Sequence, residues 1–304
     1  MTKLLRNSGV FTQTGEVTAL PDACLPEHAV AVKAWGKGHF WAFRRYIHPM
    51  MKLGWWPQEV ADEFQLFYRS LMNGEQPKLV LMAPPGHGRT EQVMDFVAFL
   101  AGREPDLKVI FVSHSRRVGL EVNLALQRIM TSEPYLSIFG SRLIDVANGA
   151  SPGLRNCRKL DYVNHRGSFY NTTIRGQITG LQLDVGILGD LKARTQPDSK
   201  AVRDRIWTWF TNDFCTRFSA MAGVVIITTR WHADDPVGRF IARNPDVRIL
   251  RYPAIAEHDE TQRLKGEALF PQHKSLSFLM ERRKIMTQSE WECEYQQNPS
   301  WLTG

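Results

Sequence analysis

The sequence predicts an α/β protein with a mostly parallel central sheet flanked by helices. From residue 78 onward, short apolar runs of strand length alternate with helical patterns, as they do in parallel sheets with covering helices. The runs are nearly continuously apolar, which is typical of strands that are covered on both faces. The chain has 304 residues, 43% hydrophobic and 23% charged, so it resembles an ordinary globular protein that buries a large core.

The strands are predicted from apolar runs such as "KLVLM" and "GVVIITT", which are rich in branched residues. The predicted strands are 78–82, 107–113, 183–188, 223–229 and 247–252.

The helices between these strands are predicted from apolar residues at helical spacing. One helix opens at Thr90 and closes at Gly102, and a second covers 120–130. A third is predicted over 199–218, where one apolar face carries Ile206, Phe210, Phe214 and Phe218. We interpret these apolar faces as core.

Two segments flank the alternating region, and they divide the chain into an N-terminal helical or lid subdomain (1–60), a core (61–257) and a connector with a terminal helix (258–304). Residues 1–60 are rich in aromatic and basic residues, and such residues can stack on nucleic-acid bases. Burial of a helical subdomain against the core is the interpretation we favour.

Charge and cysteine content give weaker indications. The formal net charge of +7 favours polyanionic partners, but the basic residues are scattered along the chain. The four cysteines form no CxxC pair. The chain has no apolar stretch of membrane-spanning length and no secretory leader, which predicts a cytoplasmic protein without a membrane partner.

The segment "APPGHGRT", residues 83–90, follows the first predicted strand and precedes a helix. A strand, a glycine-rich turn and a helix N-terminus together form a phosphate-binding loop, in which backbone N–H groups face the anion. Thr90 stands where a hydroxyl binds Mg²⁺. An ordinary Gly-Pro turn is the alternative. The predicted nucleotide-binding residues of the loop are Ala83, Pro84, Pro85, Gly86, His87, Gly88, Arg89 and Thr90.

Arg89 departs from the usual loop, which has lysine at this position. Lysine is a slim point charge that reaches the β- and γ-phosphates, whereas a guanidinium is broad and forked. Arginine keeps the positive charge of lysine, but its reach and its fit to the phosphates differ from those of lysine.

Two further polar sites follow predicted strands. Asp190 comes two residues after the end of the predicted strand 183–188, where a carboxylate can hold Mg²⁺. His232, Asp234 and Asp235 follow 223–229, but a single histidine with adjacent carboxylates is a poor zinc pattern. An ordinary polar turn is the alternative at each site.

Taken together, several segments resemble large terminase subunits, the DNA-packaging motors of tailed bacteriophages, over roughly residues 40 to 300. "TTRWHADDP" and a terminal "YQQNP" are the most specific features. The remaining matching segments, in the same order as in that family, are the loop region with its strand and helix, "QRIMTSEPYLSIFG", "GQITGLQLDVGILGD", "RYPAIAE" and "GEALFPQ".

The resemblance implies a RecA-like P-loop NTPase domain of the ASCE class. Such a domain uses ATP and Mg²⁺ to pump double-stranded DNA into a procapsid. The implied partners are DNA, the portal protein, the small terminase subunit and other copies of the chain in a ring on the portal. The implied location is the host cytoplasm.

The resemblance also implies roles for individual residues. The loop 83–90 is the Walker A segment, and Asp190 lies at Walker B, where it would hold Mg²⁺ with Thr90. Thr228, Thr229 and Arg230 fall at the motif that couples hydrolysis to movement. Gln65, or alternatively Glu63, stands where a residue contacts adenine. The arginine that acts on a neighbouring subunit is left open among Arg116, Arg117, Arg230 and others.

Two departures from the family pattern concern activity. The family has lysine at the Arg89 position, and it has a second acid where Gly189 and Asp190 supply only one. We therefore expect weakened ATP binding and slow or absent hydrolysis unless another carboxylate helps. The alternative is a catalytically impaired terminase-like protein, such as a decayed prophage copy, that binds nucleotide, DNA or portal.

Large terminases usually continue into a nuclease domain in which clustered acids hold two metal ions. This sequence ends seven residues after Gln297, so no DNA cleavage is expected from it. A separately encoded nuclease, a truncated copy and an isolated domain are the alternatives.

Overall fold

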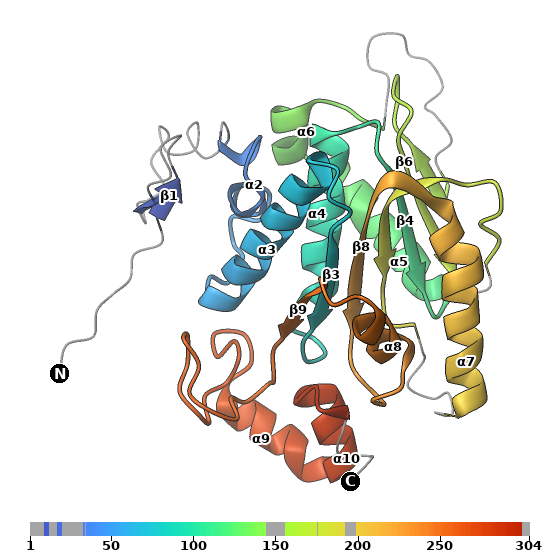
Figure 1. Cartoon of the computed structure of the whole chain (residues 1–304). Coiled ribbons are helices and arrows are strands. Elements are labelled where there is room, and N and C mark those ends of the chain that lie inside the picture. The colour runs from blue at the N-terminus through green and yellow to red at the C-terminus, as the bar shows by residue number, and fades with distance from the viewer. Residues whose placement is uncertain are drawn as a thin grey trace.

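The computed structural model describes residues 9–11, 17–19, 33, 35–143, 156–174, 176–191 and 199–299. Its centre is a seven-stranded sheet between two layers of helices (Figure 1). The predicted subdomain 1–60 is described from residue 33 onward, except for residue 34. Before that point, only the backbone of β1 (Gly9–Phe11) and β2 (Val17–Ala19) is described.

The strands of the sheet lie in the order β5-β6-β4-β7-β8-β3-β9, and every pair is parallel except β5 with β6. One strand, β8, lies between β3 and β7. The predicted α/β fold class is confirmed. The strands are β3 (Lys78–Met82), β4 (Lys108–Ser113), β5 (Lys159–Asp161), β6 (Ser168–Thr173), β7 (Leu183–Leu188), β8 (Phe218–Thr228) and β9 (Arg248–Arg251).

Alternate residues of the strands enter two separate cores. Leu79 and Leu81 of β3 pack under the first helical layer, while Val80 and Met82 face the second. The first layer contains α2 (Phe40–Ile47), α3 (Trp55–Met72), α4 (Arg89–Arg103), α5 (Arg116–Met130) and α6 (Glu133–Phe139), and the second contains α7 (Lys200–Trp209) and α8 (Pro236–Arg243).

The predicted helix over 199–218 is wrong at its end. Helix α7 ends at Trp209. The chain then forms a π turn over Phe210–Phe214 and a 3₁₀ turn over Cys215–Arg217. Phe210 and Phe214 are buried as expected and stack with ring centroids 5.8 Å apart. Phe218 instead begins β8. The π and 3₁₀ turns change the α-helical spacing before this residue, so Phe218 does not lie on the apolar helix face predicted for it.

The predicted boundary between residues 60 and 61 falls inside α3. Aromatic residues on both sides of that boundary share one core, and Phe40 lies 5.9 Å from Phe64 and 5.2 Å from Phe96 between ring centroids. The first helices therefore pack directly on the sheet layer, and the division of the chain remains a prediction.

A buried ion pair joins α2 to α4. Arg44 Nε lies 2.8 Å from Asp95 Oδ2, and the two side chains are 5% and 2% exposed. Arg44 Nη1 donates to Gln92 Oε1, and His48 Nε2 lies 2.8 Å from the second Asp95 oxygen. Asp95 is thus the shared acceptor that anchors α2.

Replacing Asp95 with alanine is expected to lower the free energy of unfolding by about 3–5 kcal/mol, because it leaves a buried guanidinium without its counter-charge. Urea unfolding of the two proteins measures the difference. Asp246→Ala is the matched control, since Asp246 pairs with Lys78 at the surface and its loss costs about 1 kcal/mol or less. Equal losses for the two variants would contradict the role assigned to the buried pair.

The C-terminal part follows β9 as a connector and then α9 (Leu276–Ile285), α10 (Gln288–Glu290) and a π turn over Trp291–Tyr295. Leu279, Trp291 and Tyr295 form a small core of their own with two alanines. Figure 1 shows this part beside the loop that leaves β3. No helix among the described residues is long and apolar enough to cross a membrane.

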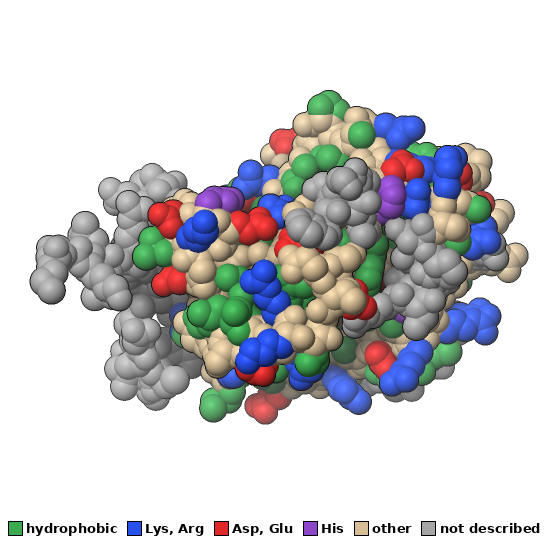
Figure 2. All heavy atoms as spheres, turned by 90° about the horizontal axis from the view of Figure 1, so that it is seen from below, with side chains coloured by type: hydrophobic (Ala, Val, Ile, Leu, Met, Phe, Trp, Pro, Cys, Tyr) green, Lys and Arg blue, Asp and Glu red, His purple; other side chains and the backbone are tan. Residues whose placement is uncertain are grey.

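Figure 2 shows the face seen from below, on the side of this C-terminal part. Lys and Arg side chains lie there among acidic, apolar and neutral ones. The basic side chains are therefore interspersed with the others on this face.

Candidate nucleotide-binding site

The candidate site lies at the carboxyl ends of three neighbouring strands. Because β3, β8 and β7 are parallel neighbours, the segments that follow them meet at one edge of the sheet. The loop 83–90 follows β3, Asp190 follows β7 and Thr229 follows β8. Topology thus brings together three of the sequence-predicted site segments.

The loop has the backbone conformation that anion binding requires. Gly86 and Gly88 have φ angles of +67° and +81°, in the left-handed region that favours glycine. Gly88 caps α4, which begins at Arg89, and no side chain caps this helix end. The first N–H groups of α4 therefore have no side-chain cap to accept their hydrogen bonds, and the positive end of the helix dipole adds to their attraction for an anion.

Arg89 is the first residue of α4, and its side chain extends toward Asp190. Its Nη2 lies 3.7 Å from Asp190 Oδ2, and only 10% of its side chain is exposed. The other terminal nitrogen, Nη1, is buried and has no hydrogen-bond partner among the described residues. Burial lowers the pKa of Arg89, and the Asp190 charge opposes that shift. A buried cation with an unused donor is suited to an incoming anion.

Asp190 connects the site to the strands on either side. Its Oδ1 accepts the Thr229 N–H at 3.0 Å, and its backbone carbonyl accepts from His114 N at 3.2 Å and Nδ1 at 3.0 Å. The side chain remains 42% exposed. One carboxylate oxygen is therefore fixed by β8, while the other faces Arg89.

A cavity of about 1110 Å³ opens beside these residues. Its lining includes Arg89, Thr90 and Asp190, together with residues of α2 and α5. The described residues contain no group of three or more side chains able to hold a metal alone. Thr90 and Asp190 nevertheless fit Mg²⁺ bound to a nucleotide, because this ion commonly takes few protein ligands and completes its shell with phosphates and water.

Gln65 does not line this cavity. Its Oε1 accepts the Phe40 N–H at 2.7 Å, so it supports the start of α2. Trp56, nine residues earlier on α3 and thus about 14 Å away along the helix, reaches the loop with its ring 6.1 Å from that of His87. Glu63, the alternative, pairs with Arg248 at the surface. The adenine-contact role stays a prediction.

The segment 228–230, which was predicted to couple hydrolysis to movement, is buried and hydrogen-bonded. Thr228 Oγ1 donates to the Thr229 carbonyl at 2.8 Å. Arg230 Nε lies 2.8 Å from Asp235 Oδ2, and its Nη2 donates to the His232 and Ala233 carbonyls, both at 3.2 Å. In this structure, Arg230 holds the turn that follows β8. Arg116 and Arg117, in contrast, are exposed at the start of α5.

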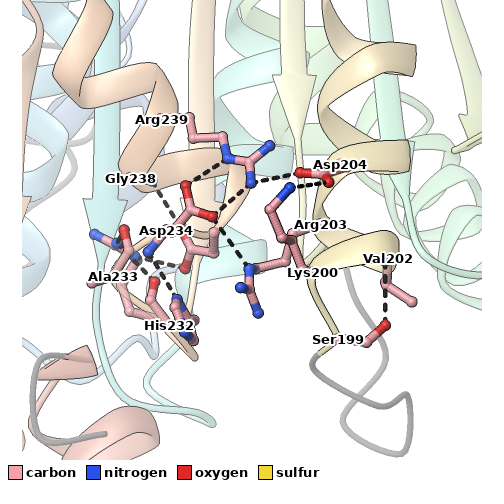
Figure 3. A network of polar contacts seen from close by, with 12 residues as sticks. Ser199, Lys200, Val202, Arg203, Asp204, His232, Ala233, Asp234, Gly238 and Arg239 are labelled. Atoms are coloured by element: carbon pink, nitrogen blue, oxygen red, sulfur yellow. Dashed lines mark hydrogen bonds and ion pairs between the residues drawn. The ribbon is translucent and has the colours of Figure 1, made fainter. Parts of the chain in front are cut away.

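A polar network extends from this turn to the second helical layer (Figure 3). Both oxygens of Asp234 accept from Arg239 of α8, at 2.7 and 2.6 Å, and Arg203 of α7 lies 3.6 Å away. Arg239 also pairs with Asp204 at 2.8 Å. The hydrogen bond from Arg239 lowers the pKa of Asp234 to about 2. Asp234 thus joins two helices rather than a metal site.

His87 in the loop is buried and neutral at neutral pH. Burial lowers its pKa to about 4, only partly offset by its hydrogen bond to the Pro85 carbonyl. Because the pKa is lower in the folded state than the usual 6.5, stability is full above pH 6.5 and falls as the pH drops toward 4.

Acidification from pH 7 to 4.5 is therefore expected to cost about 2–3 kcal/mol of unfolding free energy through His87. Urea unfolding at both pH values, on the unmodified protein and on His87→Asn, isolates this share. His39 also has a pKa of about 4 and remains in both proteins. The same pH loss in both proteins would contradict the burial of His87.

The sequence did not point to three residues at this site: His114, His273 and Lys274. His114 directly follows β4 at the same sheet edge, so its position after an apolar run was an available signal. His273 and Lys274 come from the connector, and only its folding against the loop brings them here.

Comparisons with known proteins agree with this fold. No model of a known protein family matches the chain. Over 142 residues it is 27% identical to the large terminase subunit of Enterobacteria phage T3, a match covering 45% of this chain and 23% of that protein.

Among solved structures, the HK97 bacteriophage large terminase aligns with a TM-score of 0.58 at 15% identity, covering 89% of this chain and 55% of that one. The Thermus phage P74-26 large terminase ATPase domain aligns with a TM-score of 0.49 at 14% identity, covering 73% of this chain and 88% of that one. The resemblance to large terminases expected from the motifs is thus confirmed, while the chain spans about half or less of the first two relatives.

Proposed function

We propose that this chain is an ATPase motor domain of the large-terminase type, which couples ATP hydrolysis to packaging of double-stranded DNA into a procapsid. The observation that carries the proposal is the meeting of Arg89, Asp190 and Thr229 at the ends of three adjacent strands. A phosphate cradle beside a carboxylate that can hold Mg²⁺ is an arrangement that phosphoryl transfer uses.

Different residues of the site would bind the phosphates and the metal ion. The N–H groups of the glycine loop and the unused Arg89 donor would hold the phosphates. Thr90 and Asp190 would hold Mg²⁺, which when bound neutralises charge developing on the β- and γ-oxygens.

We propose that His114 orients water. Its Nδ1 donates to the Asp190 carbonyl, because a carbonyl only accepts, so Nε2 is the ring nitrogen left for a water. His114 lines the cavity, as do the carboxylates Glu91 and Glu121. These are the groups that would take the place of the missing second acid.

The same contacts supply a route from the site to the helices. Asp190 holds the Thr229 N–H, and the turn after Thr229 is tied to α7 and α8 through Asp234 and Arg239. A change in the Asp190 contact on hydrolysis would therefore reach both helices. We propose this as the coupling element that Thr228, Thr229 and Arg230 form.

The wider assignments rest on the resemblance. We propose DNA, the portal protein and the small terminase subunit as partners, a ring of copies on the portal as the working assembly, and a division into 1–60, 61–257 and 258–304. Arg89 and the single acid after β7 favour a second candidate, a catalytically impaired protein that retains nucleotide binding.

Steady-state ATP hydrolysis with Mg²⁺, measured with and without double-stranded DNA, tests the proposal. A motor domain turns over ATP and is stimulated by DNA. ATP binding without turnover supports the impaired protein instead. Absence of both binding and turnover would contradict both candidates.

A further inference from the structure

The connector reaches the tip of the phosphate loop. Lys274 Nζ donates to the Pro85 carbonyl at 3.2 Å, and His273 Nε2 donates to the Gly86 carbonyl at 3.0 Å. In Figure 1 the segment before α9 lies beside the loop that follows β3. Two side chains nearly 190 residues away thus contact the two residues at the apex of the loop.

Aromatic packing holds the connector in this place. Phe270 is buried, and its ring lies 6.2 Å from that of Trp56 at the start of α3. Trp56 in turn lies edge-on to His87, 6.1 Å away within the loop. Phe270 also lies against Gly54, where an added Cβ would come within 2.8 Å of the ring. Lys274 therefore extends from an anchored segment.

The Lys274 ammonium approaches the loop at Gly86, which has no side chain to exclude it. A Cβ on Gly86 would lie only 2.5 Å from Lys274 Nζ, so the amino group lies directly against the loop backbone. Gly86 also belongs to the loop whose backbone we propose as the phosphate cradle. The ammonium thus lies against this proposed cradle.

Lys274 has no carboxylate to balance its charge within the described part of the chain. Its other contact is the face of the Phe278 ring, 5.2 Å away, which Arg282 also approaches. Burial and the Arg282 charge both lower the pKa of Lys274. An anion at the loop would relieve this excess of positive charge.

We propose that Lys274 is a phosphate-binding residue, which exchanges its Pro85 carbonyl contact for a terminal phosphate oxygen of a nucleoside triphosphate held in the loop. The inference rests on the proposed nucleotide binding and adds a residue to that site. A lysine from the connector supplies the slim ammonium that the loop itself lacks at Arg89. Binding of the nucleotide phosphates would thereby change the contact between the C-terminal connector and the loop.

The test is equilibrium binding of AMP, ADP and ATP, each with Mg²⁺, to the full chain and to Lys274→Ala by isothermal titration calorimetry. The expected loss of affinity is about tenfold for ATP, smaller for ADP and absent for AMP, because one charge-assisted contact to the terminal phosphates is removed. Lys274→Arg is expected to recover part of the ATP affinity.

Lys265→Ala is the matched control, since Lys265 is an exposed lysine of the same connector. Thermal unfolding of each variant shows that the fold is retained. Equal losses for all three nucleotides, or no loss, would overturn the proposal and leave Lys274 as a structural contact of the connector. Failure of the unmodified chain to bind any nucleotide would instead contradict the proposed function.

Discussion

Asp190→Asn is expected to lower Mg²⁺-dependent ATP turnover by about 100-fold or more. Asp190 lies two residues after the end of β7, and one of its carboxylate oxygens is already fixed by the Thr229 N–H. Replacing it removes the negative charge that we propose holds Mg²⁺, while keeping the shape of the side chain. A loss of about 3 kcal/mol in transition-state stabilisation corresponds to that fall in rate.

If ATP turnover is too slow to compare, the effect of Mg²⁺ on ATP binding tests the same substitution. Mg²⁺ is expected to strengthen ATP binding to the unmodified protein and to have little effect on binding to Asp190→Asn. Asp246→Asn, at the exposed Lys78 pair, provides the control for a general effect of charge. Unchanged turnover and an unchanged Mg²⁺ effect in Asp190→Asn would remove Asp190 from the metal site.

Arg89→Lys is expected to raise ATP turnover by about tenfold. In the structure the guanidinium extends toward Asp190, and its second terminal nitrogen is buried without a partner. A lysine at the same position is slimmer and would release Asp190 for Mg²⁺ while reaching the phosphates. The gain corresponds to about 1.4 kcal/mol, roughly one charge-assisted hydrogen bond.

Initial rates of ATP hydrolysis on the two proteins, prepared side by side, measure this change. Arg158→Lys, at an exposed position, controls for the exchange of arginine for lysine. A turnover of Arg89→Lys that equals or falls below that of the unmodified protein would refute the idea that Arg89 limits activity. The impaired-protein alternative would then rest on the single acid alone.

Local sequence patterns predicted those parts of the fold that depend on local chemistry. The apolar runs 78–82 and 183–188 are strands with these bounds, because continuous apolarity suits strands buried on both faces. The glycines of the loop could be located because left-handed backbone demands them. Short elements such as β5 and α8 were missed, since three or eight residues carry little periodicity.

The contacts of the site depended on tertiary structure. Nothing in the sequence indicated that Gln65 would hydrogen-bond to the start of α2, or that Arg230 would pair with Asp235 within the turn after β8. Lys274 reaches the loop only because Phe270 packs on Trp56. Residues far apart in the chain become neighbours through packing, and a single sequence does not record that packing.

Isothermal titration calorimetry of the purified full chain with ATP, in the presence of Mg²⁺ and again with the metal chelated, tests whether the proposed site binds a nucleotide. We expect saturable binding near one ATP per chain that weakens when Mg²⁺ is removed, because we propose that Thr90 and Asp190, which line the cavity, hold the metal. No binding at millimolar ATP in the presence of Mg²⁺ would contradict the proposed nucleotide site.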